Sequence, residues 1–257
     1  PCAAAYSATT SGCSRYTRDA SRPSAATGNS ESLDIGSLNL TLPAGGVSGA
    51  GTVNWAGAPQ IEFNLEGDNL DPGPYLEDWP GQLDFKGRVT ATGGEQGFTI
   101  DIENLGASGT LRDYPMQLDL AAVIRPGIID IGQAQLVSSN SSVSVSGTWG
   151  SQPSLNWSVR SPDLNELYHE LSGSLNGEGR IAGNISDPGL IGELQGSDIV
   201  SPWVNVEALA ASFTINRYNR DAVDVRLDAD GLVYGDYRIS GIDLAVSGDE
   251  ASHRYRV

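Results

Sequence analysis

The stretch "SGSLNGEGRIAGNISDPGLIGELQG", residues 172–196, holds seven glycines among its twenty-five residues, together with a spread of branched apolar side chains. Leu175, Ile181 and Leu194 are three of these apolar residues. A flexible linker carries few large apolar groups, and a helix does not tolerate this much glycine, because glycine loses the most backbone freedom on folding. Glycine inside a strand often marks a bulge or a tight curve. The stretch therefore predicts a strand and its return in a strongly coiled sheet.

Apolar and polar residues alternate outward from this stretch, over most of residues 33–257. The runs "PQIEFNLEG" (59–67) and "GFTIDIENL" (97–105) each place three large apolar side chains on one side. This two-residue period is that of a strand with one buried face. Turn-forming segments such as "TGGEQG" (92–97) and "GSQP" (150–153) separate the runs. Their spacing is typical of hairpins in series.

One segment breaks the alternation, "PDLNELYHEL" at residues 162–171. Asp163 suits a helix N-cap, Glu166 follows three residues later, and leucines recur on one helical face. The segment therefore predicts a short helix, at most one in the chain. The predicted fold class is all-β, with a long curled sheet, rich in antiparallel pairs, whose apolar interior forms an open groove.

Residues 1–32 are small and polar, show no periodicity, and hold both cysteines of the chain, Cys2 and Cys13. We interpret this segment as a linker, a disordered segment or an expression scar. A metal site there would need further cysteine or histidine ligands, which the segment lacks. The repetitive β region is predicted over residues 33–257.

Two parts of the β region resemble each other at an offset of about 92–96 residues. The segment "GQLDFKGRV" (81–89) matches "GSLNGEGRI" (173–181) in its leucine, glycine and arginine positions. We expect repeat units over about 47–140 and 143–257. Such repeats predict a quasi-linear array in which each unit mainly contacts its neighbours.

The composition disfavours several functional classes. A formal charge of −17 makes nucleic acid an improbable partner, because phosphate binding needs clustered Lys and Arg. The chain has no run of eighteen apolar residues, so no helix is expected to span a bilayer. The N-terminus lacks the pattern of a secretion signal, so any signal or anchor of the parent protein is expected outside this sequence. No cofactor is expected.

The one-faced strands raise a burial problem. Leaving about thirty large apolar side chains in water costs on the order of 45–90 kcal/mol, far more than a net stability of about 5–15 kcal/mol. With one short helix to cover them, the strands must close into a sandwich or barrel, or form a trough that holds something apolar. We expect the trough, with Trp149 at a rim. The predicted lining residues are Ile61, Phe63, Leu65, Leu83, Phe98, Ile100, Ile102, Met116, Leu118, Leu120, Leu155, Trp157, Val159, Phe213, Val223, Val225, Leu227, Leu244 and Val246.

We interpret the charged residues and histidines as structural rather than catalytic. Carboxylates on alternating strands are expected on the solvent face rather than as a glycosidase acid pair. The histidines lack a nucleophile motif such as G-x-S-x-G, so neither catalytic nor metal-binding residues are predicted. A group of three arginines is interpreted as a solvated strand pair, with lipid phosphates or a partner as the alternative. The residues considered are Glu62, Asp84, Asp101, Glu103, His169, His253, Arg217, Arg220 and Arg226.

The segment "GSLNGEGRIAGNISDPGLIGELQGSDI" (173–199) carries the pattern G-x-L-x-G-x-G-x-I-x-G-N-x-x-D-P-x-L-x-G-x-L. A later G-L-x-x-G-x-x-x-I follows, and then Ser247-Gly248 with His253. In these features the chain resembles the TamB family, AsmA-like translocation and assembly module proteins of Gram-negative bacteria. The resemblance covers roughly residues 33–257.

This resemblance implies a "β-taco" groove in the periplasm, part of a bridge that carries phospholipid acyl chains between the two membranes and supports outer-membrane biogenesis. It further implies an inner-membrane anchor, and an outer-membrane TamA or BAM-type β-barrel protein as partner, both through regions outside this sequence.

Two other classes remain as alternatives. A secreted β-solenoid adhesin or structural passenger domain predicts coils of about 20–25 residues around a closed, dry core. A carbohydrate-active β enzyme requires an acid pair in a cleft. The longer hairpin spacing speaks against the first alternative, and the lack of a convincing acid pair against the second.

Overall fold

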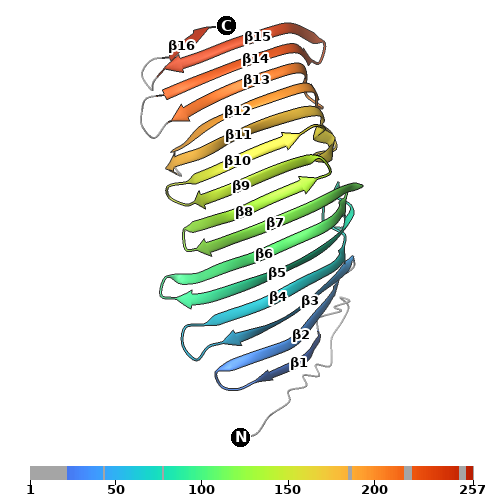
Figure 1. Cartoon of the computed structure of the whole chain (residues 1–257), viewed down its shortest axis with the longest axis vertical. Coiled ribbons are helices and arrows are strands. Elements are labelled where there is room, and N and C mark those ends of the chain that lie inside the picture. The colour runs from blue at the N-terminus through green and yellow to red at the C-terminus, as the bar shows by residue number, and fades with distance from the viewer. Residues whose placement is uncertain are drawn as a thin grey trace, which may run out of the picture.

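The described part of the computed structural model is a single antiparallel sheet. It covers residues 22–42, 44–76, 78–184, 187–216, 222–248 and 253–256, so Cys2 and Cys13 lie outside it. Sixteen strands stand in sequence order, each paired with the strands before and after it (Figure 1). The all-β prediction is confirmed, and so is the antiparallel pairing.

The strands are long and the connections between most of them are short. One 3₁₀ turn, η1 (Leu164–Glu166), accompanies them. The strands are β1 (Arg22–Gly28), β2 (Ser32–Leu42), β3 (Gly45–Asn54), β4 (Gln60–Leu70), β5 (Gly81–Gly94), β6 (Gly97–Leu111), β7 (Tyr114–Arg125), β8 (Ile128–Ser138), β9 (Ser141–Trp149), β10 (Ser154–Ser161), β11 (Ser172–Asn184), β12 (Asp187–Val200), β13 (Asn205–Asn216), β14 (Ala222–Tyr234), β15 (Tyr237–Gly248) and β16 (His253–Arg256). β1 lies inside the segment 1–32, so strand pairing begins ahead of Leu33.

The sheet is open at both ends. β1 pairs only with β2 and β16 only with β15, so the sixteen strands do not close into a barrel. At about 4.8 Å between neighbouring strands, the stack extends for roughly 72 Å. The sheet is twisted but not strongly curled (Figure 1), and the predicted strong coiling therefore exceeds what the structure shows.

The glycines of the apolar face are numerous, yet they do not coil the sheet tightly, because several of them lie opposite aromatic residues. Gly179 is paired with Trp157, and Gly192 with Phe213. A Cβ atom on Gly179 would lie 2.6 Å from Cζ2 of Trp157, and one on Gly192 would lie 2.9 Å from Cζ of Phe213. These glycines therefore leave room for aromatic rings that lie flat across the neighbouring strand.

A smaller number of glycines do mark bulges, as predicted. The pairing of β11 with β12 shifts register between Ser172 and Ser174, where Gly173 has a φ of +93°. The pairing of β5 with β6 shifts at Gly87. Each bulge resets the phase of a strand, and the apolar residues beyond it return to the same face.

The predicted helix at residues 162–171 is shorter than expected. Only Leu164–Glu166 form a 3₁₀ turn, with Asp163 at the N-cap accepting a hydrogen bond from the amide of Asn165. Within this turn the side chain of Glu166 is buried. A few helical and turn hydrogen bonds remain, among them the one from the Tyr168 amide to the carbonyl oxygen of Leu164 at 2.9 Å.

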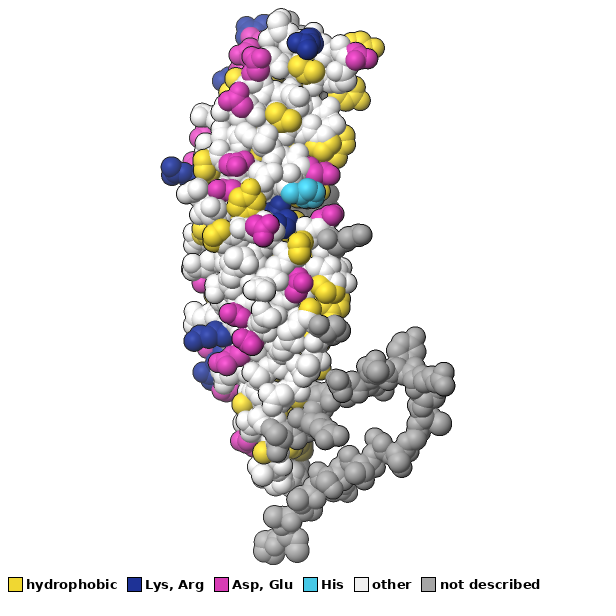
Figure 2. Space-filling view, turned by 90° about the vertical axis from the view of Figure 1, so that its right-hand side faces the viewer, with side chains coloured by type: hydrophobic (Ala, Val, Ile, Leu, Met, Phe, Trp, Pro, Cys, Tyr) yellow, Lys and Arg dark blue, Asp and Glu magenta, His cyan; other side chains and the backbone are white. Residues whose placement is uncertain are grey.

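The fold has one layer and little interior. Among the described residues, the buried hydrophobic side chains are those of Ala122, Leu155, Leu164, Val206 and Ala229. Figure 2, an edge view, shows Lys, Arg, Asp and Glu side chains protruding along the left margin of the sheet.

The contact between glycine and aromatic ring gives a first prediction. We expect Gly179→Ala to lower the free energy of unfolding by about 1–3 kcal/mol and to shift the fluorescence of Trp157, because the added methyl group displaces the indole. Gly57→Ala is the matched control, since a Cβ there has no neighbour within 4 Å. Urea denaturation followed by tryptophan emission measures both effects. Equal stabilities for the two variants would contradict this account of the glycines.

Candidate functional site

The register of the sheet places all nineteen predicted lining residues on one face, which we call the apolar face. Phe63 on β4 pairs with Val89, and Val89 pairs with Ile102 on β6. Another row crosses the C-terminal half, from Trp157 through Gly179, Gly192 and Phe213 to Val225. These rows make one continuous surface. That the surface binds lipid stays a prediction.

The apolar face is only partly shielded from solvent. Of the nineteen residues, Leu155 is buried, Phe98 is exposed, and the other seventeen are half-buried. Their shielding comes from neighbours in the same sheet, because every described strand belongs to that sheet and η1 lies at its edge. Within the described residues, no second layer covers the face.

Several residues of the apolar face were missed in the sequence. Phe85 pairs with Gly67, and Leu136 pairs with Leu118 and Val143. Each of them follows the same two-residue period as its neighbours, so the signal was present. The bulges hide it, because the pairing of β7 with β8 shifts register between Ala121 and Ala122 and breaks the alternation there.

The carboxylates considered for catalysis lie on the opposite, polar face. Arg88 on β5 pairs with Glu62 on β4 at 2.7 Å and approaches Glu103 on β6 at 4.0 Å. Asp84 accepts a hydrogen bond from the amide of Asn69 at 2.8 Å. The side chains of Glu62, Arg88 and Glu103 are all close to half-exposed. These ion pairs therefore contribute little to the free energy of folding and mainly balance charge across neighbouring strands.

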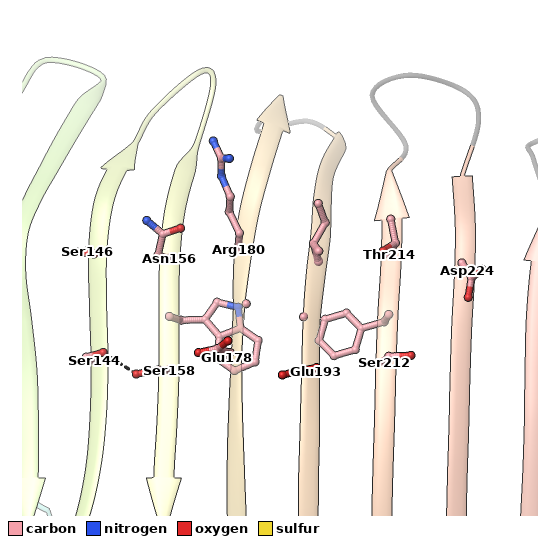
Figure 3. A pocket seen from close by; sticks show the side chains of 15 residues that line it. Ser144, Ser146, Asn156, Ser158, Glu178, Arg180, Glu193, Ser212, Thr214 and Asp224 are labelled. Carbon is pink, nitrogen blue, oxygen red and sulfur yellow. Dashed lines mark hydrogen bonds between the residues drawn. The ribbon is translucent and has the colours of Figure 1, made fainter.

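The polar face has a shallow hollow over β9 to β14, shown in Figure 3. One row of its lining contains Ser144, Ser158, Glu178, Glu193 and Ser212 (Figure 3). The hydroxyls of Ser144 and Ser158 are hydrogen-bonded at 2.8 Å. The hollow forms because short hydroxyl side chains leave the backbone uncovered. Its lining also includes the apolar residues Trp157, Ile191 and Phe213, so the hollow is mixed in character.

A buried polar cluster fixes the β10–β11 connection to the sheet edge. Glu166 accepts hydrogen bonds from Ser141 Oγ at 2.6 Å, from the Asn140 amide at 3.0 Å and from Asn140 Nδ2 at 3.2 Å. Its side chain is 6% exposed. Burial alone would raise the pKa of this carboxyl, but the hydrogen bonds from Ser141, Asn140 and Ser139 outweigh burial and lower the pKa below its ordinary value.

Arg112 connects this cluster to the β4–β5 connection. It sits in the β6–β7 turn with a φ of +51°, a conformation that non-glycine residues rarely adopt. Its Nη2 donates to the carbonyl oxygens of Leu167 at 2.9 Å and Glu166 at 3.3 Å. Its guanidinium carbon lies 4.3 Å from the ring centroid of Trp79. The connections 71–80 and 162–171 are thus joined along one edge, a feature we call the edge brace.

The remaining candidate residues form no site in the described structure. Arg226 lies 3.7 Å from Asp224 on the same strand, while Arg217 and Arg220 lie outside the described residues. His169 is 3.9 Å from its neighbour Glu170, and His253 begins β16.

Cysteine, histidine and carboxylate side chains do not gather into a metal-binding group anywhere in the described part of the chain. In that same part, the structure has no helix with the length and apolar character needed to cross a membrane.

The edge brace predicts a dependence of stability on pH. Because the folded state lowers the pKa of Glu166, its contribution is present above the ordinary pKa of a glutamate and is lost as pH falls through the folded value. We expect Glu166→Gln to lose about 1–3 kcal/mol at neutral pH and to converge on the wild type in acid. Denaturation at pH 7 and at a series of lower pH values measures this. Glu170→Gln, with an exposed side chain, is the control, and an equal loss there would contradict the brace.

Comparisons with known proteins agree with the repetitive all-β fold. A family model described as "TamB, N-terminal domain" matches residues 13–257. The translocation and assembly module subunit TamB of Haemophilus influenzae is 21% identical over 206 residues, which are 79% of this chain and 16% of that protein. The chain thus spans about a sixth of the length of this relative. No solved structure matches. Because the family model covers nearly all of the sequence, the chain belongs to the TamB family, as its glycine-rich repeats predict.

Proposed function

We propose that this chain is a non-enzymatic segment of a lipid-transfer bridge, in which the apolar face shields phospholipid acyl chains in the periplasm. The observation that carries the proposal is the continuous row of half-buried apolar side chains with no covering layer among the described residues. A fully apolar lining suits hydrocarbon and offers polar substrates no hydrogen-bonding partners. Membership of the TamB family supports this assignment.

The energetics favour an acyl ligand on such a face. Each methylene group removed from water contributes about 0.8 kcal/mol, so a chain laid along several strands gains enough to leave water. The face runs without interruption along the roughly 72 Å stack of strands, and a lipid can therefore change position without meeting a polar barrier. Transfer along it is passive, so its direction depends on other parts of the assembly.

The open sheet supplies one wall of the proposed groove. A single flat wall leaves the far side of an acyl chain in water, so we propose that the full-length protein closes around the lipid by further curling or through additional segments. The name of the Haemophilus relative, a translocation and assembly module subunit, supports a role in outer-membrane biogenesis beside a β-barrel partner such as TamA. An inner-membrane anchor belongs to the same proposal.

The solenoid alternative fits the structure less well. A solenoid adhesin stacks short coils around a closed core, whereas here consecutive strands form hairpins and leave one apolar face without a cover among the described residues. An adhesin would also not need apolar side chains aligned along the whole sheet.

Site-specific photo-crosslinking tests the proposed lipid contact. A photoreactive residue at Leu118 in the full-length protein, expressed in the bacterial envelope, is expected to capture phospholipid. The same residue at Gln117, which neighbours Leu118 on β7 but faces the other way, is expected to capture much less. Mass spectrometry of the lipid adducts measures both yields. Equal yields at the two positions would overturn the proposed lipid contact.

Charge substitution tests transport. Leu118→Arg or Val225→Arg places a cation on the apolar face, so we expect weakened outer-membrane integrity, measured by detergent and antibiotic sensitivity, with the β structure largely retained by circular dichroism. Gln117→Arg and Asp224→Arg add the same side chain on the polar face and are expected to behave as wild type. Normal integrity in both apolar-face variants would contradict the proposal.

A further inference from the structure

The edge that carries the brace changes character over β12 to β15. Towards the C-terminal end of this edge, hydrophobic side chains stand out from the surface (upper right in Figure 2). Trp203 is 69% exposed, Tyr234 59% and Tyr237 73%, and Val200 and Ile239 are also exposed. We call these five residues the aromatic edge patch. None of the five is among the nineteen predicted lining residues.

The exposure of Trp203 is fixed by its turn. Ser201 Oγ donates to the carbonyl oxygen of Val204 at 2.7 Å and accepts from the amides of Val204 at 3.0 Å and Trp203 at 3.3 Å. The backbone amide of Ser201 also donates to the carbonyl oxygen of Val204 at 3.1 Å. These hydrogen bonds fix the backbone of the turn, so less backbone freedom is lost when a partner binds to the exposed indole.

The two tyrosines are held by the next connection along the edge. Tyr234 and Tyr237 are register partners at the ends of β14 and β15, joined by Gly235 and Asp236. Gly235 has a φ of +57°, as a tight two-residue hairpin turn requires. Asn205, which follows the turn of Trp203, pairs with Val233 next to Tyr234. The three rings are therefore presented by adjacent, tightly turned connections.

Carboxylates outnumber cations in the strand ends and connections that carry these rings. Residues 198–207 and 228–239 contain Asp198, Glu207, Asp228, Asp230 and Asp236 but a single cation, Arg238. Aromatic faces attract cations, and the attraction increases when carboxylates lie close by. The patch thus combines exposed aromatic rings with a net negative charge. A side chain with a flat or aliphatic body and a positive charge is complementary to it.

The same edge already contains one contact of this kind. The Trp79 ring of the β4–β5 connection is covered by Arg112 from the following connection. Trp203 occupies a connection on the same edge, and within the described residues no cation lies over its ring. From the exposed rings on tightly turned connections, the excess of carboxylates in these segments and this internal precedent, we propose that the aromatic edge patch binds an arginine-rich segment of a partner protein.

Arginine is favoured over lysine for a physical reason. The planar guanidinium stacks on Trp and Tyr rings and is less strongly hydrated than an ammonium group, so it loses less on leaving water. Contact through exposed carboxylates also predicts that binding weakens as salt screens the charges.

Peptide binding tests the proposal on the 257-residue chain. The probe is a fluorescein-labelled peptide of alternating Gly and Arg, with Gly-Lys and Gly-Glu peptides for comparison, and the readout is fluorescence anisotropy at low and high salt. We expect the Gly-Arg peptide to bind tightest, and Trp203→Ser/Tyr237→Ser to weaken it by about fivefold or more. Trp55→Ser/Tyr255→Ser removes two exposed aromatics elsewhere and is expected to bind as wild type.

Three outcomes would overturn the proposal. Equal binding of the Gly-Arg peptide to the wild type and to Trp203→Ser/Tyr237→Ser would show diffuse attraction to a chain of charge −17. Phosphatidylcholine vesicles bound through the same two residues, without peptide binding, would show a membrane contact instead. Sedimentation equilibrium showing a dimer that these substitutions dissociate would show that the patch meets a second copy. Circular dichroism of each variant establishes that the sheet is intact.

Discussion

An apolar face that the described sheet does not cover is the constraint on which the rest of the structure depends. All sixteen described strands pair with their sequence neighbours, so most strand hydrogen bonds are made within one layer, and no strand of the described residues is left to form a second. Apolar contacts must therefore be made within the layer. The aromatic rings that lie over paired glycines, as Trp157 lies over Gly179, bury apolar surface that a sandwich would bury between two sheets.

The alternation in the sequence was enough to predict the strands, the face and the antiparallel order. A two-residue period assigns each side chain to a face directly, and the hairpin spacing then leaves one simple order. The edge brace was beyond this reasoning, because Trp79, Arg112 and Glu166 come from connections far apart in the chain and share no period. Glu166 in particular was noted only as the residue three positions after a helix N-cap, and the hydrogen bonds from Asn140 and Ser141 show why it is buried.

The error about glycine has a general cause. Glycine in a strand permits either a bend or the close approach of another group, and sequence alone does not separate the two. The pairing separates them here, because Gly51 faces Phe63 and Gly192 faces Phe213 across neighbouring strands. A glycine directly opposite an aromatic residue in a hairpin is thus better read as space for the ring, whereas a glycine without such a partner, such as Gly173, marks the bulge.

The polar face, the apolar face and the braced edge of the single sheet have different physical roles. Charge on the polar face keeps the chain soluble but acts too far from the apolar side chains to shield them from water. Continuous apolar surfaces of this extent are rare on isolated soluble proteins, because they associate with one another or with a ligand. The brace holds one edge through buried hydrogen bonds, so the face cannot easily collapse on itself to escape water. An occupant of the face would therefore complete the structure, and the hydrocarbon chain that we propose would match its apolar chemistry.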